Sequence, residues 1–442
     1  MEKKTYQKMT AISIMTFVFW VASLFISGLV GDREWMSKQA QNEIAESWSN
    51  KQDFVGPIIC VPVCKDSTAT MPYTCMYVLP ERLEMTADIQ SETLHRGMFD
   101  ASVYRTKVNG KGSYNLSQMH DLGQNADKEK SVKIDWKNAQ IIVAIKDKRG
   151  LEDGIKVNIG GKVAELNMHF NDFGKSKIAS IFGSDMEPIC ATADLSAMVG
   201  RNDVNFEVTT ELKGSGELNV APIGQSTVLT ISGNCKDPSF NGFMLPSSRN
   251  VTDDGFEATW KISSLNRNDV DQVFYADNRE KAFQTVGTKL LIMGGQYTKT
   301  DRALKYAFLV ILLSLAAVFT AEMCVKGDIN VLSYVLISCA LVLFYLLLLS
   351  FGEWVGFSAA YFISAFMTLG LIGLYLKAIV RKNLPAIAVC MFMALVNLFI
   401  FVLLSIESMA LLAGTLGLFV VVGAAMFFSL RIVNNKPEKV QE

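Results

Sequence analysis

Five uncharged apolar runs constrain this chain more than any other feature of its sequence. They cover residues 9–31, 329–352, 354–376, 383–406 and 408–430. A hydrocarbon core about 30 Å thick is crossed by roughly 20 helical residues. Each run is therefore long enough to span a bilayer as a helix.

A sixth span is expected at residues 306–321, although this run is shorter. Lys305 and Glu322 flank it, and long charged side chains can reach the headgroups while their stems stay in the apolar region. We therefore expect six transmembrane helices, one near the N-terminus and five in succession. The first is interpreted as an uncleaved signal anchor, because the apolar part of a cleaved signal peptide is only about 7–15 residues long. A cleaved signal peptide is the alternative.

Lysine and arginine residues in the short loops indicate the orientation, because they are retained on the cytoplasmic side. With six spans, every basic loop falls on one side, and the opposite loops around Glu353 and Glu407 contain no lysine or arginine. We expect both termini to be cytoplasmic and residues 32–302 to face outward. Glu353 and Glu407 are interpreted as solvated residues at the outer helix ends.

The outward region is predicted to be mainly antiparallel β. Residues 32–50 first continue the N-terminal span as a polar helix carrying Trp35 and Trp48. The sequence leaves two locations for Trp35, one at the bilayer interface and one packed on the outward domain. Alternating apolar residues then favour strands. NGKG at 109–112 predicts a turn, and DDG at 253–255 predicts a hairpin.

These patterns give one domain organisation. The expected parts are a cytoplasmic N-terminus at 1–8, transmembrane helix 1 at 9–31, a mainly β domain at 32–302, a five-helix transmembrane bundle at 303–430 and a cytoplasmic tail at 431–442.

Five of the eight cysteines fall in the outward region. Cys64 and Cys75 flank a predicted turn at 65–72, and a disulfide between them is one interpretation in an oxidising compartment. Reduced thiols buried in the core are the other, because free cysteine is often buried.

Motifs for catalysis or metal binding are not found in the sequence. Its three histidines, His95, His120 and His169, lie in separate segments, and no H-E-x-x-H or C-x-x-C pair is present. A G-x-S pattern ends at Ser358 in the fourth span. No histidine occurs after His169 that could serve as the base for this serine. We expect no catalytic residues, no cofactor and no metal. The expected partners are the lipid bilayer and other envelope proteins, and no nucleic acid.

The chain resembles the CreD family of bacterial inner-membrane proteins over nearly its whole length. The segments that carry the resemblance are VGPIICVPV (55–63), YVLPERL (77–83), DKRG (147–150), FNGFMLPSSRNVTDDGFEATWKIS (240–263), TDRALKYAFLVI (300–311) and FYLLLLSFGEWVGFSAAY (344–361). The resemblance implies one N-terminal helix, a large periplasmic domain, a C-terminal helix cluster and a bacterial inner-membrane location. It also implies a role in envelope integrity or the response to envelope stress, without an established enzymatic activity.

Two motifs of the family hold candidate functional residues. Asp301, Arg302 and Lys305 lie before the second span, and one hypothesis is that they couple the outward domain to the bundle. Arg302 or Lys305 would then meet lipid phosphates, or Asp301 would pair with the outward domain. A solvated helix boundary is the alternative, since charged flanks are usual there.

The second motif contains Asp147, Arg149 and Gly150, whose role the resemblance leaves unknown. A catalytic pair of Asp147 with Arg149 and a salt bridge within a turn are both open interpretations.

The sequence leaves three hypotheses for the function. The first is a non-enzymatic envelope protein that acts through its periplasmic domain. The second is a periplasmic protein that binds a lipid or small hydrophobic molecule, and the third is a membrane enzyme with an unrecognised site.

Overall fold

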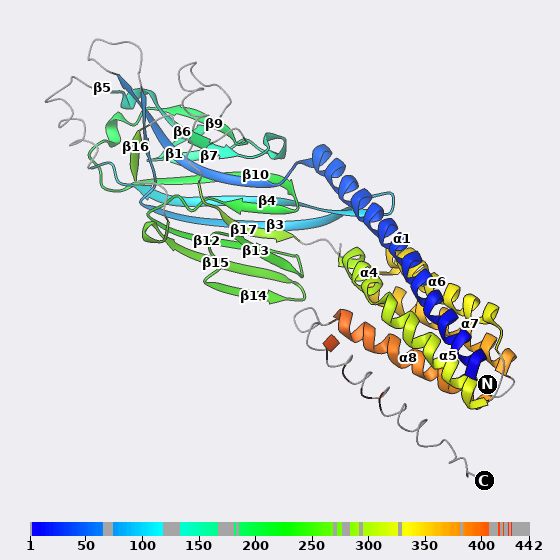
Figure 1. Ribbon diagram of the computed structural model, residues 1–442. Coiled ribbons are helices and arrows are strands. Elements are labelled where there is room, and N and C mark those ends of the chain that lie inside the picture. Colours follow the sequence, from blue (N-terminus) through cyan, green and yellow to red (C-terminus); the bar gives the residue numbers. More distant parts are fainter. Residues whose placement is uncertain are drawn as a thin grey trace, which may run out of the picture. The chain divides into compact units, whose positions relative to one another are not determined.

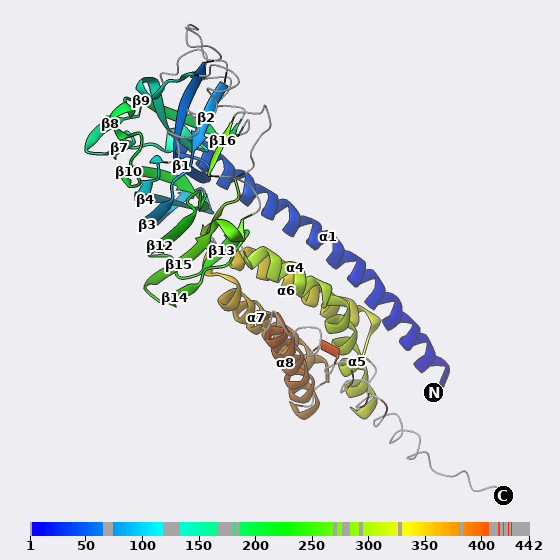
Figure 2. The same ribbon diagram turned by 90° about the vertical axis from the view of Figure 1, so that its left-hand side faces the viewer.

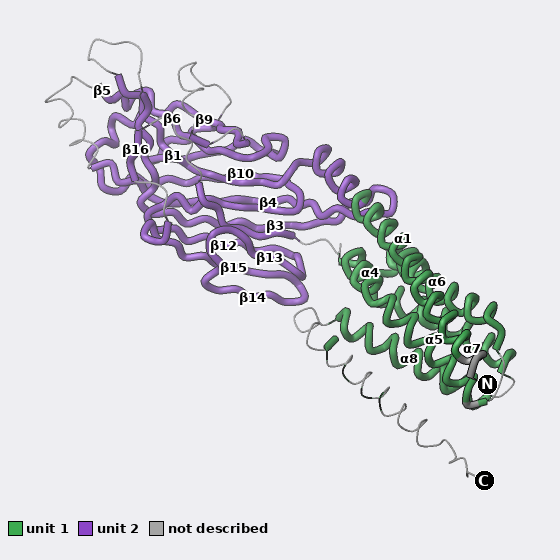
Figure 3. Tube along the Cα trace, in the orientation of Figure 1, with its two compact units in different colours: residues 1–36, 293–442 green, residues 37–292 purple. Residues whose placement is uncertain are grey.

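The computed structural model divides the chain into two compact units, residues 37–292 and residues 1–36 together with 293–442 (Figure 3). We refer to them as the β unit and the helical unit. The residues that the structure describes are 2–64, 74–117, 133–166, 181–182, 185–267, 272–275, 283–290, 295–325, 329–380, 383–405, 414, 415, 419, 423 and 426.

The β unit contains two sheets. The first has nine strands: β1 (Gln52–Cys64), β2 (Thr74–Val78), β5 (Lys133–Ile134), β6 (Ala139–Ile145), β9 (Glu187–Ala193), β11 (Glu217–Val220), β13 (Pro238–Gly242), β16 (Val273–Tyr275) and β17 (Val286–Leu290). Strand β1 is central, antiparallel to β2, β5 and β6 and parallel to β11. Figure 2 shows β1, β2 and β16 side by side.

The second sheet has eight strands in the order β14-β15-β12-β3-β4-β10-β7-β8. Their bounds are β3 (Arg82–Arg96), β4 (Phe99–Tyr114), β7 (Lys156–Ile159), β8 (Lys162–Glu165), β10 (Val204–Ser215), β12 (Ser226–Gly233), β14 (Ser248–Thr252) and β15 (Gly255–Ser263). The long strands β3, β4 and β10 lie side by side (Figure 1). All pairs in this sheet are antiparallel except β3 with β12. The prediction of a mainly antiparallel β domain is confirmed.

One apolar core joins the two sheets. Strand β10 alternates buried and more exposed residues, as expected for a strand with one face inward. Strands β1 and β6 are buried along nearly their whole length, so the first sheet is covered on both faces at its centre. Short 3-10 turns, η1 (Trp136–Asn138), η2 (Lys148–Gly150), η3 (Ser196–Met198) and η4 (Ser264–Asn266), connect strands around this core.

The predicted turn at NGKG is wrong. Residues 109–112 lie inside β4, where Gly110 pairs with Met85 and Gly112 pairs with Leu83. A Cβ on Gly112 would lie 2.0 Å from the carbonyl oxygen of Arg82. The glycine therefore permits close packing within the sheet and does not turn the chain. The hairpin predicted at DDG is confirmed, since β14 and β15 pair antiparallel across it.

Helix α1 (Glu2–Trp48) is continuous from the apolar N-terminal run into the polar segment that follows it. This confirms the expectation that residues 32–50 extend the first span as a helix. Residues up to Met36 belong to the helical unit, and residues from Ser37 belong to the β unit. Trp35 lies in the helical unit and is 64% exposed.

The helical unit contains α1, α4 (Gly295–Lys305), α5 (Ala307–Val325), α6 (Val331–Val355), α7 (Phe357–Val380) and α8 (Asn383–Ser405). Helices α1, α6, α7 and α8 are each long and apolar enough to cross a membrane, and α4 with α5 forms a pair bent by 47° that gives a fifth candidate span. The last predicted span along the chain, 408–430, lies almost entirely outside the described residues. The described part of the chain thus supports four or five spans.

Candidate functional site

The family motif at residues 147–150 folds against the end of α1. Asp147 Oδ2 accepts hydrogen bonds from the Asn50 N–H at 2.9 Å and from Arg149 Nη2 at 2.7 Å. Asp147 Oδ1 accepts from the Arg149 N–H and from Arg149 Nε, each at 3.0 Å. These bonds from Arg149 hold the pKa of the buried Asp147 carboxyl well below its usual range, although burial acts in the opposite direction. Asp147 is therefore ionised at neutral pH.

Arg149 also closes the last turn of α1. Its Nη1 donates to the carbonyl oxygen of Glu46 at 2.6 Å. The last four carbonyl groups of a helix lack partners within the helix, and a positive charge is favourable at that end. The guanidinium thus satisfies a helix carbonyl while it neutralises Asp147.

Gln52, the first residue of β1, fixes the backbone of the motif. Its Nε2 donates to the carbonyl oxygen of Asp147 at 2.7 Å, and its Oε1 accepts from the Asp147 N–H at 3.2 Å. A Cβ on Gly150 would lie 2.1 Å from Gln52 Nε2 and 2.4 Å from the carbonyl oxygen of Lys213. This crowding explains the glycine at the third position after Asp147.

Trp48, the last residue of α1, lies between two cations. The Arg105 Cζ is 4.7 Å and the Lys213 Nζ is 5.3 Å from the centre of its ring, within the range of cation–π attraction. One turn earlier on the helix, Ile44 packs against the buried Ala101 and Val103. We call Trp48, Asn50, Gln52, Asp147 and Arg149 the α1 anchor. All of its contacts lie within the β unit.

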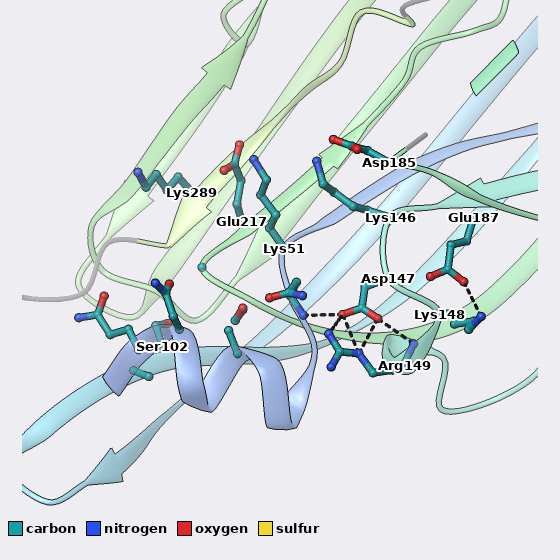
Figure 4. Close-up of a pocket in the computed structure, with 17 residues that line it drawn as sticks. Lys51, Ser102, Lys146, Asp147, Lys148, Arg149, Asp185, Glu187, Glu217 and Lys289 are labelled. Carbon is teal, nitrogen blue, oxygen red and sulfur yellow. Dashed lines mark hydrogen bonds and ion pairs between the residues drawn. The ribbon is translucent and has the colours of Figure 1, made fainter. Parts of the chain in front are cut away.

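A cavity of about 790 Å³ opens beside the α1 anchor. Its volume is within the usual range for ligand sites, but such sites are mostly apolar. Here nine charged residues line the cavity, namely Lys51, Lys146, Asp147, Lys148, Arg149, Asp185, Glu187, Glu217 and Lys289 (Figure 4). Gln41, Asn42 and Ala45 of α1 complete one side.

Ion pairs and hydrogen bonds occupy much of this lining. Lys148 contacts Glu187 at 3.0 Å (Figure 4). Lys146 contacts Asp53 at 3.2 Å, just outside the cavity. Glu217 accepts hydrogen bonds from Asn219 and Asn241. The remaining polar groups of this lining can hold a polar or charged group.

The second candidate set, before the bundle, lies on α4. Asp301 accepts a hydrogen bond from Ser27 Oγ of α1 at 2.8 Å and contacts Lys305 Nζ at 2.9 Å. Arg302 is half-buried on the same helix. Both contacts lie within the helical unit. Asp301 joins α4 to α1.

The burial of two carboxylates in the helical unit was not foreseen from the sequence. Glu322, which was expected to extend toward the headgroups, is 5% exposed within the protein. It contacts Lys8 at 2.5 Å and accepts from the Tyr334 hydroxyl at 2.6 Å. Glu353 was expected to be solvated, but its side chain is 8% exposed and accepts from the Tyr297 hydroxyl at 3.2 Å. Both residues join helices.

The proposed disulfide between Cys64 and Cys75 is absent, and both side chains are buried. The turn predicted between them lies outside the described residues. Of the three histidines, His120 and His169 also lie outside, and His95 contacts Asp100 at 2.7 Å on the surface. No cluster of three or more metal-ligand residues occurs within the described ranges.

Comparison with known proteins gives a match over nearly the whole chain. The family model described as Inner membrane protein CreD matches residues 4–434. The chain belongs to the CreD family. The inner membrane protein CreD of Escherichia coli (strain K12) is 25% identical over 452 residues, which cover 97% of this chain and 93% of that protein. The CreD match thus includes both units, the α1 anchor and the α4 segment.

Proposed function

We propose that this chain is a non-enzymatic inner-membrane protein that supports cell-envelope integrity or the response to envelope stress. Residues 32–302 would lie in the periplasm and both termini in the cytoplasm. The positions of the basic loops support this orientation. Other envelope proteins would receive the response.

The observation that carries the proposal is the attachment of α1 at both of its ends. Its last turn is held by the α1 anchor inside the β unit. Its N-terminal part packs in the helical unit, where Ile12 and Met15 belong to the same apolar cluster as Ile311 and Leu315. One helix therefore has well-defined partners in both units, as a mechanical connection requires.

The geometry of Asp147 favours this structural role over a catalytic one. Both carboxylate oxygens already accept hydrogen bonds, and the lowered pKa keeps the group ionised. A general acid or base needs a pKa near the working pH and access to a substrate.

The test is a deletion strain of the native host under detergent, β-lactam and bile-type stress. The intact chain should restore resistance to leakage. An Arg149→Ala variant, which loses the bonds to Asp147 and to the Glu46 carbonyl, should insert normally but rescue poorly. Glu187→Ala is the matched control, because Glu187 lines the same cavity but pairs only with Lys148 among the interactions described.

Unchanged integrity of the deletion strain under every stress would refute the envelope role. Full rescue by Arg149→Ala at normal membrane levels would instead leave the envelope role intact. It would show that this role does not depend on the α1 anchor.

A further inference from the structure

Most charged side chains that line the cavity beside the α1 anchor already have partners within the protein. Their ion pairs and hydrogen bonds neutralise or stabilise them without a ligand. The residues engaged in this way are Lys146, Asp147, Lys148, Arg149, Glu187 and Glu217. A molecule in the cavity is therefore recognised by the polar groups that remain.

Two lysines of the lining are among those remaining groups. Within the part of the chain that the structure describes, the ammonium groups of Lys51 and Lys289 form no ion pair and no hydrogen bond, and both residues are exposed. The side-chain hydroxyls of Ser102 and Ser215 line the same cavity and also make no hydrogen bond there. An ammonium group has three donors and no acceptor. The lining thus keeps donor capacity that an anion can use.

The two lysines lie on one face of the first sheet, on either side of Glu217. Glu217 of β11 pairs with Lys289 of β17, and the next residue of β11, Leu218, pairs with Gln52 of β1. Lys51 therefore falls beside Glu217, and Figure 4 shows Lys289, Glu217 and Lys51 in that order. Because neighbouring strands are about 4.8 Å apart, the Cα atoms of the two lysines are about 10 Å apart. Their long side chains can reach one group placed between them.

Glu217 does not take up the charge of either lysine in the structure. Its Oε1 accepts hydrogen bonds from Asn219 Nδ2 at 3.0 Å and from Asn241 Nδ2. Amide donors stabilise an ionised carboxylate without adding a charge of their own. The row of Lys51, Glu217 and Lys289 consequently carries an excess of one positive charge on the cavity side.

We propose that this cavity binds a compact oxyanion, a phosphate or carboxylate group, between the ammonium groups of Lys51 and Lys289. Charge-assisted hydrogen bonds of about 2.7–2.9 Å join the oxyanion to the two lysines. The hydroxyls of Ser102 and Ser215 are further donors in the same lining, and a volume of about 790 Å³ leaves room for the rest of a small molecule. The proposal goes beyond the envelope role and does not depend on the compartment that holds the β unit.

The test measures how fast single lysines of the purified full chain are acetylated. The chain is held in phosphatidylcholine discs and treated with sulfo-N-hydroxysuccinimide acetate in chloride, inorganic phosphate or acetate, at equal ionic strength because salt screens exposed charges. Mass spectrometry reads each lysine. Phosphate or acetate should slow the modification of Lys51 and Lys289 and leave Lys261 unchanged, since Lys261 is an exposed lysine of β15 outside the cavity. Unslowed modification of Lys51 and Lys289 in both anions would overturn the proposal.

Substitutions test whether the two lysines act on one anion. Lys51→Gln should raise the anion concentration that half-protects Lys289 about tenfold or more, because one charge-assisted contact is lost. Lys261→Gln is the matched control and should leave that concentration unchanged. Asp185→Asn, which removes a negative charge from the lining, should lower it. Unchanged protection of Lys289 in Lys51→Gln would contradict a shared site, as would weaker protection in Asp185→Asn.

A further arm separates two sources of the oxyanion. The chain is placed in phosphatidylglycerol discs with chloride as the anion in solution. Slower modification of Lys51 and Lys289 in these discs than in phosphatidylcholine discs identifies the phosphate of a lipid headgroup. Protection by added phosphate or acetate alone identifies a soluble oxyanion, and protection in neither arm overturns the site.

Discussion

At the scale of single residues, the contacts of Asp147 show how a short motif acts over a long sequence distance. The carboxylate binds the Asn50 N–H across 97 positions of the chain, and Arg149 extends the link to the Glu46 carbonyl across 103 positions. A buried charge is tolerated because it is paired and hydrogen bonded on both oxygens. Removal of its charge should therefore weaken the end of α1 more than removal of an exposed charge nearby.

Asp147→Asn should lower the free energy of unfolding of the β unit by about 1.5–3 kcal/mol at neutral pH, the range for hydrogen bonds to a charged group. The folded pKa of Asp147 is depressed, so its contribution is present above the unfolded carboxyl pKa of about 4 and is lost as pH falls toward the folded pKa. The difference between wild type and variant should shrink below about pH 4. Denaturant unfolding of the full chain in mild detergent at pH 7 and pH 3 measures this.

Glu187→Gln provides the comparison for that series. Glu187 and Lys148 are 41% and 50% exposed, and an exposed ion pair contributes about 0–1 kcal/mol. A loss in Glu187→Gln as large as that in Asp147→Asn would contradict a special role for the buried carboxylate.

At the scale of elements, α1 depends on packing at its C-terminal end. The Trp48 ring contacts two cations, and Arg105 is itself held by Glu92 at 3.1 Å and Glu152 at 3.0 Å. These contacts order the ring and one of its cationic neighbours together. The last turn of α1 is thus fixed to the second sheet by side chains from β4 and β10, and Glu92 of β3 and Glu152 hold Arg105 in place.

Trp48→Ala should destabilise this end of α1 by about 1–3 kcal/mol, since it removes a partly buried aromatic ring and its cation–π contacts. Hydrogen exchange of residues 37–48 in the purified chain should become faster. Trp35→Ala is the control on the same helix, because Trp35 is 64% exposed and should leave this exchange unchanged. Equal effects of the two substitutions would show that the Trp48 contacts do not hold the helix.

At the scale of the whole molecule, local patterns predicted the β unit and the four or five spans that the described residues support, because run length and period two are read directly along the chain. Distant pairing could not be read in that way. Glu322 is buried because Lys8, 314 positions away, neutralises it. The glycines of NGKG lie in a strand because neighbouring strands approach them closely, and that crowding is absent from the local sequence.

The continuity of α1 is the feature by which the two units should act together. Trp35→Pro should remove one internal helix hydrogen bond and disturb the helix by about 3 kcal/mol or more. Membrane insertion and the unfolding of the β unit should remain normal, but rescue of the deletion strain should be lost. Trp35→Ala should rescue fully, since it keeps the helix. Full rescue by Trp35→Pro would show that an unbroken α1 is not required.

The two attachments of α1 also impose an order on the assembly of the chain. Helix α1 leaves the ribosome first. Arg149 and Lys213, which contact its C-terminal end, are made much later, and Glu322, which pairs with Lys8 near its beginning, comes later still. During most of synthesis, the polar C-terminal turns of α1 therefore lack the partners that hold them in the finished protein. Chains that stop before Glu322 leave Lys8 without this buried counter-ion, so early termination should yield products that quality-control proteases can distinguish from the finished protein.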